Sequence, residues 1–151
     1  MHHITIYTDG SSRGNPGPGG YGVILISGKH SKELSAGFRK TTNNRMELMA
    51  VIIALESLKY DHSEVEIYSD SKYVVEAVEK KWLIGWEKKQ FAKVKNPDLW
   101  NRFLHAYRKH KVKFHWVKGH NQHPLNERCD ELATTAADFA ATGIDEWYEA
   151  N

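Results

Sequence analysis

The sequence predicts an α/β fold, and three observations lead to this class. The first forty residues read as short strands joined by glycine-rich turns, whereas the remainder alternates between helical and strand-like segments. Two of the strand-like segments end in an aspartate, at the position where open α/β sheets place their chemistry. With 151 residues, of which 40% are hydrophobic, the chain is long enough to bury one core.

Residues 4–9 are the first expected strand, because apolar and polar side chains alternate there and the strand closes on Asp9. A glycine-rich turn over residues 14–20 follows, and then a second strand over residues 21–26, a hairpin tip at Gly28 and a third strand over residues 33–39. Both phosphate-binding glycine signatures require a helix after the glycines. The strand that follows here therefore disfavours a nucleotide-binding loop.

The first helix is expected to start at residues 41–44 and to run to about Lys59. Its apolar side chains recur three and four residues apart, and Glu47 stands at the head of that stripe. A carboxylate on the core-facing side costs free energy unless a cation meets it. A local cap or an arginine partner would serve as well as a metal ion, so this residue alone does not decide.

A short strand over residues 65–69 ends at Asp70, and Ser71 then opens a helix. Asp70 thus closes this strand as Asp9 closes the first one. For either residue taken singly, a turn is the simpler interpretation. Two strands that both end in an aspartate indicate a shared site at the carboxyl ends of the sheet.

Positive charge is concentrated between Lys80 and Lys113, where the net charge is +9, although the whole chain carries only +2. Trp82, Trp86 and Phe91 lie among the lysines, and this combination suits a surface that binds the phosphates and bases of nucleic acid. A solvated charged face is the alternative. For one of the two tryptophans we expect inward packing.

The remaining elements follow from capping and periodicity. Residues 96–98 are expected to start a helix with an apolar stripe to Tyr107, and residues 112–117 to form a strand with Trp116 on its apolar face. After a polar loop, Asn126 is expected to cap a last helix that ends near Gly143. On that helix Asp130 heads a line of alanines that permits close packing. Residues 144–151 read as a loose tail.

Four carboxylates share one description, since each lies near the end of an element on or next to its inward side. They are Asp9, Glu47, Asp70 and Asp130. Unpaired, they would repel one another, and divalent cations with oxygen ligands, Mg²⁺ or Mn²⁺, remove that conflict. Two such ions, about 3.5–4 Å apart, can clamp the oxygens of a phosphoryl displacement. The basic, aromatic segment indicates that the phosphate belongs to nucleic acid.

Six segments then stand in a fixed order along the chain. They are Tyr7-Thr8-Asp9-Gly10-Ser11, Gly14-Asn15-Pro16-Gly17-Pro18-Gly19-Gly20, Thr42-Asn43-Asn44-Arg45-Met46-Glu47, Ser69-Asp70-Ser71, Trp116-Val117-Lys118-Gly119-His120 and Asn126-Glu127-Arg128-Cys129-Asp130. Over about residues 4–141 they resemble ribonuclease H of the bacterial type 1 family. The resemblance implies a five-stranded mixed sheet, the first three strands antiparallel, with helices on both faces. Residues 1–143 would form a single catalytic domain.

The resemblance also implies an activity. The family consists of endonucleases that cut the RNA strand of an RNA/DNA hybrid with little sequence preference and leave 5′-phosphate and 3′-hydroxyl ends. The implied cofactor is Mg²⁺, two ions per active site, with Mn²⁺ as a substitute. The implied catalytic residues are Asp9, Glu47, Asp70, His120 and Asp130, where the four carboxylates hold the metal and the histidine assists proton movement or product release.

Substrate contacts are implied in the same way. Asparagines in the second and third segments, with Arg45, would follow the hybrid backbone and RNA 2′-hydroxyls, while Thr42 and Asn96 would bind a DNA phosphate. Residues 80–95 resemble a basic protrusion with Trp82 and Trp86 as its aromatic pair. The full set of candidates is Asn15, Thr42, Asn43, Asn44, Arg45, Lys72, Trp82, Trp86, Lys88, Lys89, Asn96 and Asn126. Glu87 interrupts the protrusion, and we expect it to weaken affinity.

Three alternatives remain open. A zinc site could draw on His115, His120, His123 and Cys129, although their spacing is irregular. A non-catalytic binding module would be expected to lack one of the four acids, and a metal-dependent DNA nuclease or transposase to lack the third segment. One cysteine, no signal segment and no apolar run near 20 residues predict a cytoplasmic protein without a membrane span. We expect a monomer whose partner is the hybrid duplex.

Overall fold

The computed structural model describes residues 2–118 and 123–151, and its described residues contain one five-stranded sheet in the order β3-β2-β1-β4-β5. The strands are β1 (His3–Ser12), β2 (Gly17–Ser27), β3 (His30–Thr41), β4 (Glu64–Ser69) and β5 (Lys111–Trp116). Strands β1, β2 and β3 pair antiparallel, whereas β4 pairs parallel with both β1 and β5. The predicted mixed sheet is confirmed.

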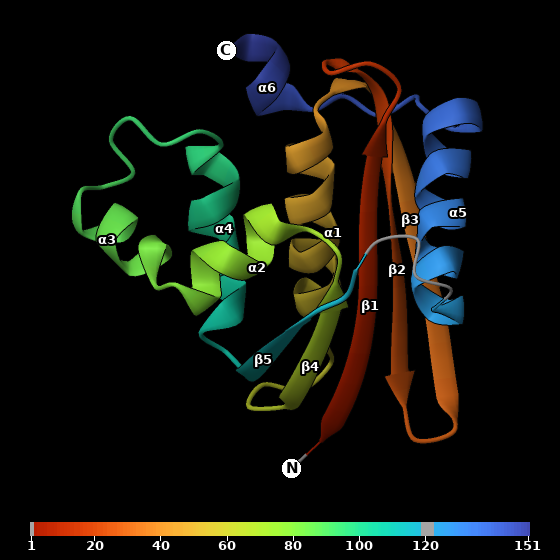
Figure 1. The fold of residues 1–151 in the computed structure, drawn as a ribbon, viewed down its shortest axis with the longest axis vertical. Helices are drawn as coiled ribbons and strands as arrows, with labels where there is room; N and C mark the ends of the chain where they lie inside the picture. The colour runs from red at the N-terminus through yellow and green to blue at the C-terminus, as the bar shows by residue number, and fades with distance from the viewer. Residues whose placement is uncertain (1, 119–122) are drawn as a thin grey trace.

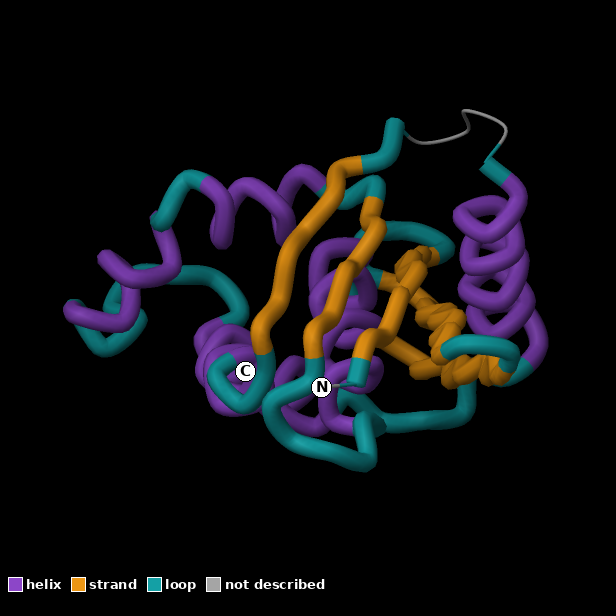
Figure 2. Tube along the Cα trace, turned by 90° about the horizontal axis from the view of Figure 1, so that it is seen from below, coloured by secondary structure: helices purple, strands orange, loops and turns teal. Residues whose placement is uncertain are grey.

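Helices cover both faces of this sheet, as Figures 1 and 2 show. They are α1 (Asn43–Glu56), α2 (Lys72–Glu79), α3 (Trp82–Lys88), α4 (Pro97–Tyr107), α5 (Pro124–Phe139) and α6 (Glu146–Ala150). Helix α5 lies alone on one face, over β1, β2 and β3, while α1 and α4 pack together on the other. Within the described ranges, no helix is both long and apolar enough to cross a lipid bilayer.

The parallel pairing of β1 with β4 places Asp9 and Asp70 together. Tyr7 is opposite Tyr68 and Thr8 is opposite Ser69 in this register, so the next residue of each segment is Asp9 or Asp70. β4 ends before Asp70, as the sequence predicts. The prediction that the first strand ends at Asp9 is wrong, because β1 continues to Ser12 through its pairing with residues 19–22 of β2.

Helix α5 approaches the sheet closely because glycines in β2 and β3 present no side chain to it. A Cβ on Gly22 would lie 2.4 Å from the carbonyl oxygen of Cys129 and 2.7 Å from Cβ of Leu132. The small side chains of α5, Ala133 and Ala137 among them, are fully or almost fully buried against this surface. This close contact fixes the position of Asp130, which lies on the same helix.

The ends of α5 differ from the prediction. The helix starts at Pro124 after His123 as its N-cap residue, and it ends at Phe139. Asn126 is therefore not the cap but a buried residue of the first turn. Proline is well suited to the first helical position because its missing N–H would have no partner there, and the helix starts three residues earlier than predicted.

The last residues also differ from the loose tail predicted for residues 144–151. Gly143 pairs with Phe38 beside β3, and the short helix α6 follows. Arg39 on β3 forms an ion pair with Glu149 at 2.8 Å, and the side chain of Asp145 is buried. Composition alone does not reveal this docking, because the partners lie on distant elements.

Candidate active site

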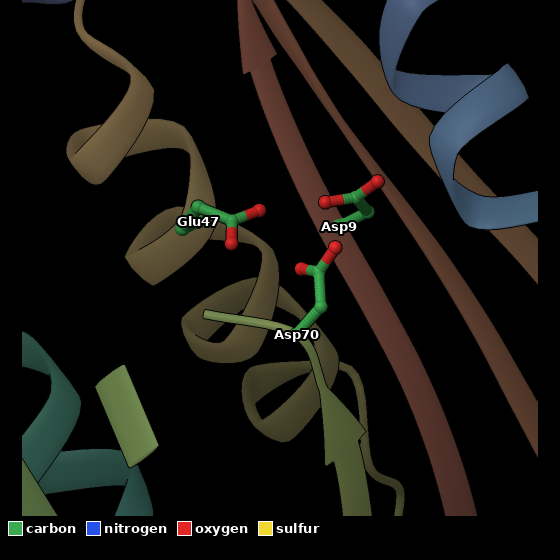
Figure 3. A group of neighbouring side chains, drawn as sticks. All are labelled: Asp9, Glu47 and Asp70. Atoms are coloured by element: carbon green, nitrogen blue, oxygen red, sulfur yellow. The ribbon is translucent and has the colours of Figure 1, made fainter. Parts of the chain in front are cut away.

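Three of the four predicted carboxylates converge where β4 ends beside β1, as Figure 3 shows. Asp9 comes from β1, Asp70 from the residue after β4, and Glu47 from the first turns of α1. An oxygen from each carboxylate lies within 4.8 Å of one from each of the others. Three elements distant in sequence thus supply three hard oxygen ligands to one place.

Gly10 permits this convergence. A Cβ at this position would lie 2.3 Å from the backbone nitrogen of Glu47 and 2.4 Å from the carbonyl carbon of Met46. Only glycine allows α1 to approach β1 so closely. The N–H of Gly10 donates to Oδ1 of Asp9 at 2.9 Å and also to Oε1 of Glu47.

The protein holds these carboxylates in an environment that opposes their ionisation. Burial, followed by the charges of Asp70 and Asp130, raises the pKa of Asp9 to about 7, although hydrogen bonds from Glu47 and Gly10 act in the other direction. Burial and the nearby Asp9 raise the pKa of Glu47 well above its ordinary value. A hard dication would remove this conflict, and the donor set fits Mg²⁺ or Mn²⁺.

Asp130 borders the same site without joining the cluster of three. It lines a cavity of about 470 Å³ that also contains the three clustered carboxylates. The other lining residues are Gly10, Ser11, Asn43, Asn44, Ser71, Lys72, Tyr73 and Trp116. The predicted histidine, His120, lies outside the described residues.

Several predicted substrate residues surround this cavity. Asn43, Asn44 and Lys72 line it directly. Asn15 lies beside them, because its Oδ1 accepts a hydrogen bond from the backbone N–H of Asn43 at 3.1 Å. Thr42 is the N-cap residue of α1 and is half-buried. A duplex backbone could therefore meet polar side chains next to the carboxylates.

Trp116 is a cavity residue that the sequence reasoning missed. The alternating pattern placed it on one strand face with Phe114, but Trp116 is 47% exposed at the end of β5, whereas Phe114 is buried. The ammonium of Lys72 lies 5.1 Å from its ring centroid, and its indole N–H donates to the carbonyl oxygen of Asp70 at 3.3 Å. Trp116 is the last residue of β5 and pairs with Ser69, the residue before Asp70. This position at the end of the strand is the signal that could have identified it.

Arg45 does not occupy the predicted substrate surface. Its side chain is 1% exposed and forms ion pairs with Asp98 and Asp145. The prediction that the side chain of Arg45 contacts the substrate directly is therefore wrong. The reason is geometric, since successive helix residues point in different directions and Arg45 faces α4 while Asn43 and Asn44 face the cavity.

The basic segment keeps most of its expected character. Trp82 is 45% exposed on α3, whereas Trp86 packs edge to face against Trp100 at 5.5 Å between ring centroids. One tryptophan therefore packs inward, as expected. Glu87 forms an ion pair with Arg108, so its charge is neutralised locally and does not face Lys88 and Lys89 unopposed.

The described residues give no support to a zinc site. His115 forms a 2.9 Å hydrogen bond with Glu66. Cys129 is fully buried, and burial strongly raises the pKa of its thiol, whereas zinc requires the thiolate. The ring of His123 lies beside that of Tyr7, with the centroids 5.1 Å apart and the planes tilted by 41°. In the described ranges, the group of side chains near enough to share a metal ion is Asp9, Glu47 and Asp70.

Comparison with known proteins agrees with this geometry. A family model described as RNase H matches residues 1–138. A ribonuclease H from Desulforamulus reducens is 56% identical over 91% of this chain and 89% of its own length, and one from Shewanella amazonensis is 53% identical over 99% and 97%. The crystal structure of LC11-RNase H1 in complex with RNA/DNA hybrid has a TM-score of 0.70 at 33% identity, and covers 92% of this chain and 99% of its own.

Proposed function

The chain belongs to the RNase H family, and from this premise we propose that it is an endonuclease that hydrolyses the RNA strand of RNA/DNA hybrids. The proposed products carry 5′-phosphate and 3′-hydroxyl ends. The observation that carries the proposal is the cluster of Asp9, Glu47 and Asp70, whose oxygens lie within 4.8 Å of one another where β4 ends beside β1. A binding module on this fold would have no use for buried carboxylates that repel each other.

We propose that Asp9, Glu47, Asp70 and Asp130 hold two Mg²⁺ ions, with Mn²⁺ as a substitute. When bound, such ions supply an activated water and stabilise the charge that develops on the phosphate oxygens. The chain contributes a rigid frame for the carboxylates, because strand β1, helix α1 and the Gly10 N–H fix Asp9 and Glu47 before any ligand arrives. His120 is proposed to assist proton movement or product release.

Selection of a hybrid requires both strands to be read at once. We propose that Asn15, Asn43 and Asn44 follow the RNA strand, where 2′-hydroxyls distinguish RNA from DNA. Thr42 and Asn96 are proposed to bind a phosphate of the DNA strand. Contacts to backbone and sugar carry no base information, so we expect little sequence preference.

The basic segment that contains helix α3, residues 80–95, is proposed to hold the duplex at a second place. Trp82, Lys88 and Lys89 are exposed there, and lysines that neutralise phosphates give affinity that depends on salt. We further propose that residues 1–143 act as a single catalytic domain, that the protein works as a monomer, and that it acts in the reducing cytoplasm, where a lone thiol such as Cys129 persists.

The test compares strand-labelled duplexes. RNA/DNA, RNA/RNA and DNA/DNA duplexes of one sequence would be incubated with the protein, with and without Mg²⁺. We expect cleavage of the RNA strand of the hybrid alone, and only with metal. Cleavage of DNA/DNA would favour a DNA nuclease instead, and hybrid binding without cleavage would favour a binding module.

A further inference from the structure

A buried ion network joins the C-terminal segment to the start of α1. Arg45 Nε donates to Asp145 Oδ2 at 2.7 Å, and Nη2 donates to Oδ1 at 2.9 Å. The same guanidinium donates to both oxygens of Asp98, at 2.9 and 2.8 Å. The side chains of Arg45 and Asp145 are 1% and 4% exposed, so the pair is shielded from solvent.

Arg45 also touches both residues proposed for the DNA phosphate. Its backbone N–H donates to Thr42 Oγ1 at 3.2 Å, and its Nη1 donates to Asn96 Oδ1 at 3.2 Å. Thr42 precedes α1 and Asn96 precedes α4, so these two residues come from different elements. Their relative placement is therefore set through one residue, Arg45, whose backbone N–H holds Thr42 and whose guanidinium holds Asn96.

Asp145, the residue before α6, holds the side chain of Arg45 in place. Besides binding Arg45, its carboxylate accepts a hydrogen bond from Thr41 Oγ1 at 2.8 Å, next to Thr42 in the chain. The ring centroid of Trp147 lies 5.1 Å from the guanidinium carbon. Asp145 thus contacts both the segment that carries Thr42 and the arginine that contacts Asn96.

A further hydrogen bond extends the network to the cavity. Asn96 Nδ2 donates to the hydroxyl of Tyr73 at 2.9 Å, and Tyr73 lines the cavity that holds the carboxylates. Burying a charged network of this kind costs desolvation free energy, and its net contribution to stability is often small. A buried ion network that fixes one geometry at a binding site can be retained despite this cost.

We propose that Asp145 is a positioning residue for the substrate, which holds Arg45 so that Thr42 and Asn96 stand at the separation that one DNA phosphate requires. This inference rests on the proposed function and extends it to the C-terminal segment. Asp145 contacts neither the carboxylate cluster nor the cavity in the described residues, so its effect is on binding and not on the chemical step.

The test uses Asp145→Asn, which keeps the shape of the side chain and removes its charge. Glu149→Gln is the matched control, because it removes the ion pair of the same segment with Arg39 and leaves Arg45 untouched. For Asp145→Asn we expect KM for the hybrid to rise about fivefold to tenfold while kcat changes less than about twofold, as for loss of a coupled buried contact. The control should keep both constants.

A second readout separates positioning from general loss of stability. Hybrids would carry one uncharged methylphosphonate at successive positions of the DNA strand. The unmodified protein should show a raised KM at one position, and Asp145→Asn should lose most of that sensitivity. If Asp145→Asn does not fold at the assay temperature, Thr41→Val removes one hydrogen bond to the same carboxylate and should show a smaller loss of the same kind.

The outcomes are distinguishable from failure of the proposed function. If the unmodified protein does not cleave hybrids, the proposed function itself fails. If it cleaves them but is indifferent to every methylphosphonate, or if Asp145→Asn lowers only the melting temperature, the positioning role is overturned and the nuclease activity stands.

Discussion

The backbone N–H of Gly10 donates a hydrogen bond to the carboxylate of Glu47, although the two residues are 37 positions apart in the chain. The contact joins the end of β1 to the first turns of α1 at the point where a side chain on residue 10 would overlap the helix backbone. The position of Glu47 relative to Asp9 therefore depends on the absence of a single methyl group.

Gly10→Ala should displace α1 from β1. The added Cβ would lie 2.3 Å from a backbone nitrogen that cannot move alone. We expect the free energy of unfolding to fall by about 1–3 kcal/mol, the usual cost of overpacking, and hybrid cleavage to fall with it. Urea denaturation and a cleavage assay measure both. Gly85→Ala is the control for stability, because nothing lies within 4 Å of a Cβ there, and it should gain about 0.5–1 kcal/mol in helix α3.

Asp9→Asn and Asp70→Asn should each abolish cleavage while the fold stays intact. One neutral ligand disrupts a site that depends on three close carboxylates. Asp9→Asn should also stabilise the metal-free protein, because one of the mutually repelling charges is removed. Thermal unfolding with and without Mg²⁺ checks both effects. Asp138→Asn, which breaks an exposed ion pair with Arg13, should retain cleavage. Full activity in either site variant would refute the metal assignment.

Stability of the metal-free protein should depend on pH through Asp9. Its pKa rises from 3.8 to about 7 on folding, so the folded state binds more protons than the unfolded state between these values. The free energy of unfolding therefore falls as pH rises through this window, by on the order of a few kcal/mol. His110, whose pKa is lowered by burial, contributes the opposite slope near neutral pH.

The contribution of Asp9 is isolated by comparing the unmodified chain with Asp9→Asn in urea denaturation from pH 5 to 8. The variant should show a flatter or rising curve, and Mg²⁺ should restore stability to the unmodified chain at the upper end, because metal competes with protons for the carboxylates. Parallel curves for the two proteins would exclude Asp9 as the source.

Replacing Lys88 and Lys89 together by alanine should weaken hybrid binding and flatten its salt dependence. Each lost phosphate contact should reduce the slope of log K against log salt by about 0.7–0.9. Binding titrations at several salt concentrations measure this slope. Lys29 and Lys32, exposed near the β2–β3 turn, form the control pair, since they change the net charge equally. An unchanged slope for the α3 variant would remove this helix from the interface.

Substitution of the two tryptophans of α3 should have different effects on the free energy of unfolding and on hybrid binding. Trp86 packs against Trp100, so Trp86→Ala should lower the free energy of unfolding by about 2–4 kcal/mol. Trp82 is exposed, so Trp82→Ala should change stability by less than about 0.5 kcal/mol while it weakens hybrid binding. Chemical denaturation and binding titration of both variants test this division, and equal losses of stability would contradict it.

Much of the fold could be predicted because its signals are local. Alternation identified the strands that carry Asp9 and precede Asp70, and helical periodicity placed Glu47 on an inward face. The parallel pairing of β1 with β4 brings Asp9 and Asp70 together, whereas Glu47 reaches them through the close approach of α1 at Gly10. Alternation and helical periodicity are both properties of short segments, and the folded protein keeps the secondary structure that they predict.

Features that depend on contacts between distant elements could not be predicted. The guanidinium of Arg45 finds Asp98 and Asp145, which are 53 and 100 positions away, and nothing near Arg45 in the chain indicates these partners. The docking of Asp145 likewise needs Thr41 and Arg45 already in place. The exposure of Trp116 could not be predicted either, because alternation identifies the two faces of a strand but not the residue at which neighbouring elements stop covering a face.

Assembly of the site also has a consequence for the order of synthesis. Asp9 leaves the ribosome early, whereas Asp130 lies on α5, which packs across β1, β2 and β3 only after these strands exist. By the proposed chemistry, a nascent chain still attached to its messenger therefore carries an incomplete set of ligands. Newly made molecules can therefore begin to cut hybrids only after α5 has left the ribosome and packed against the sheet.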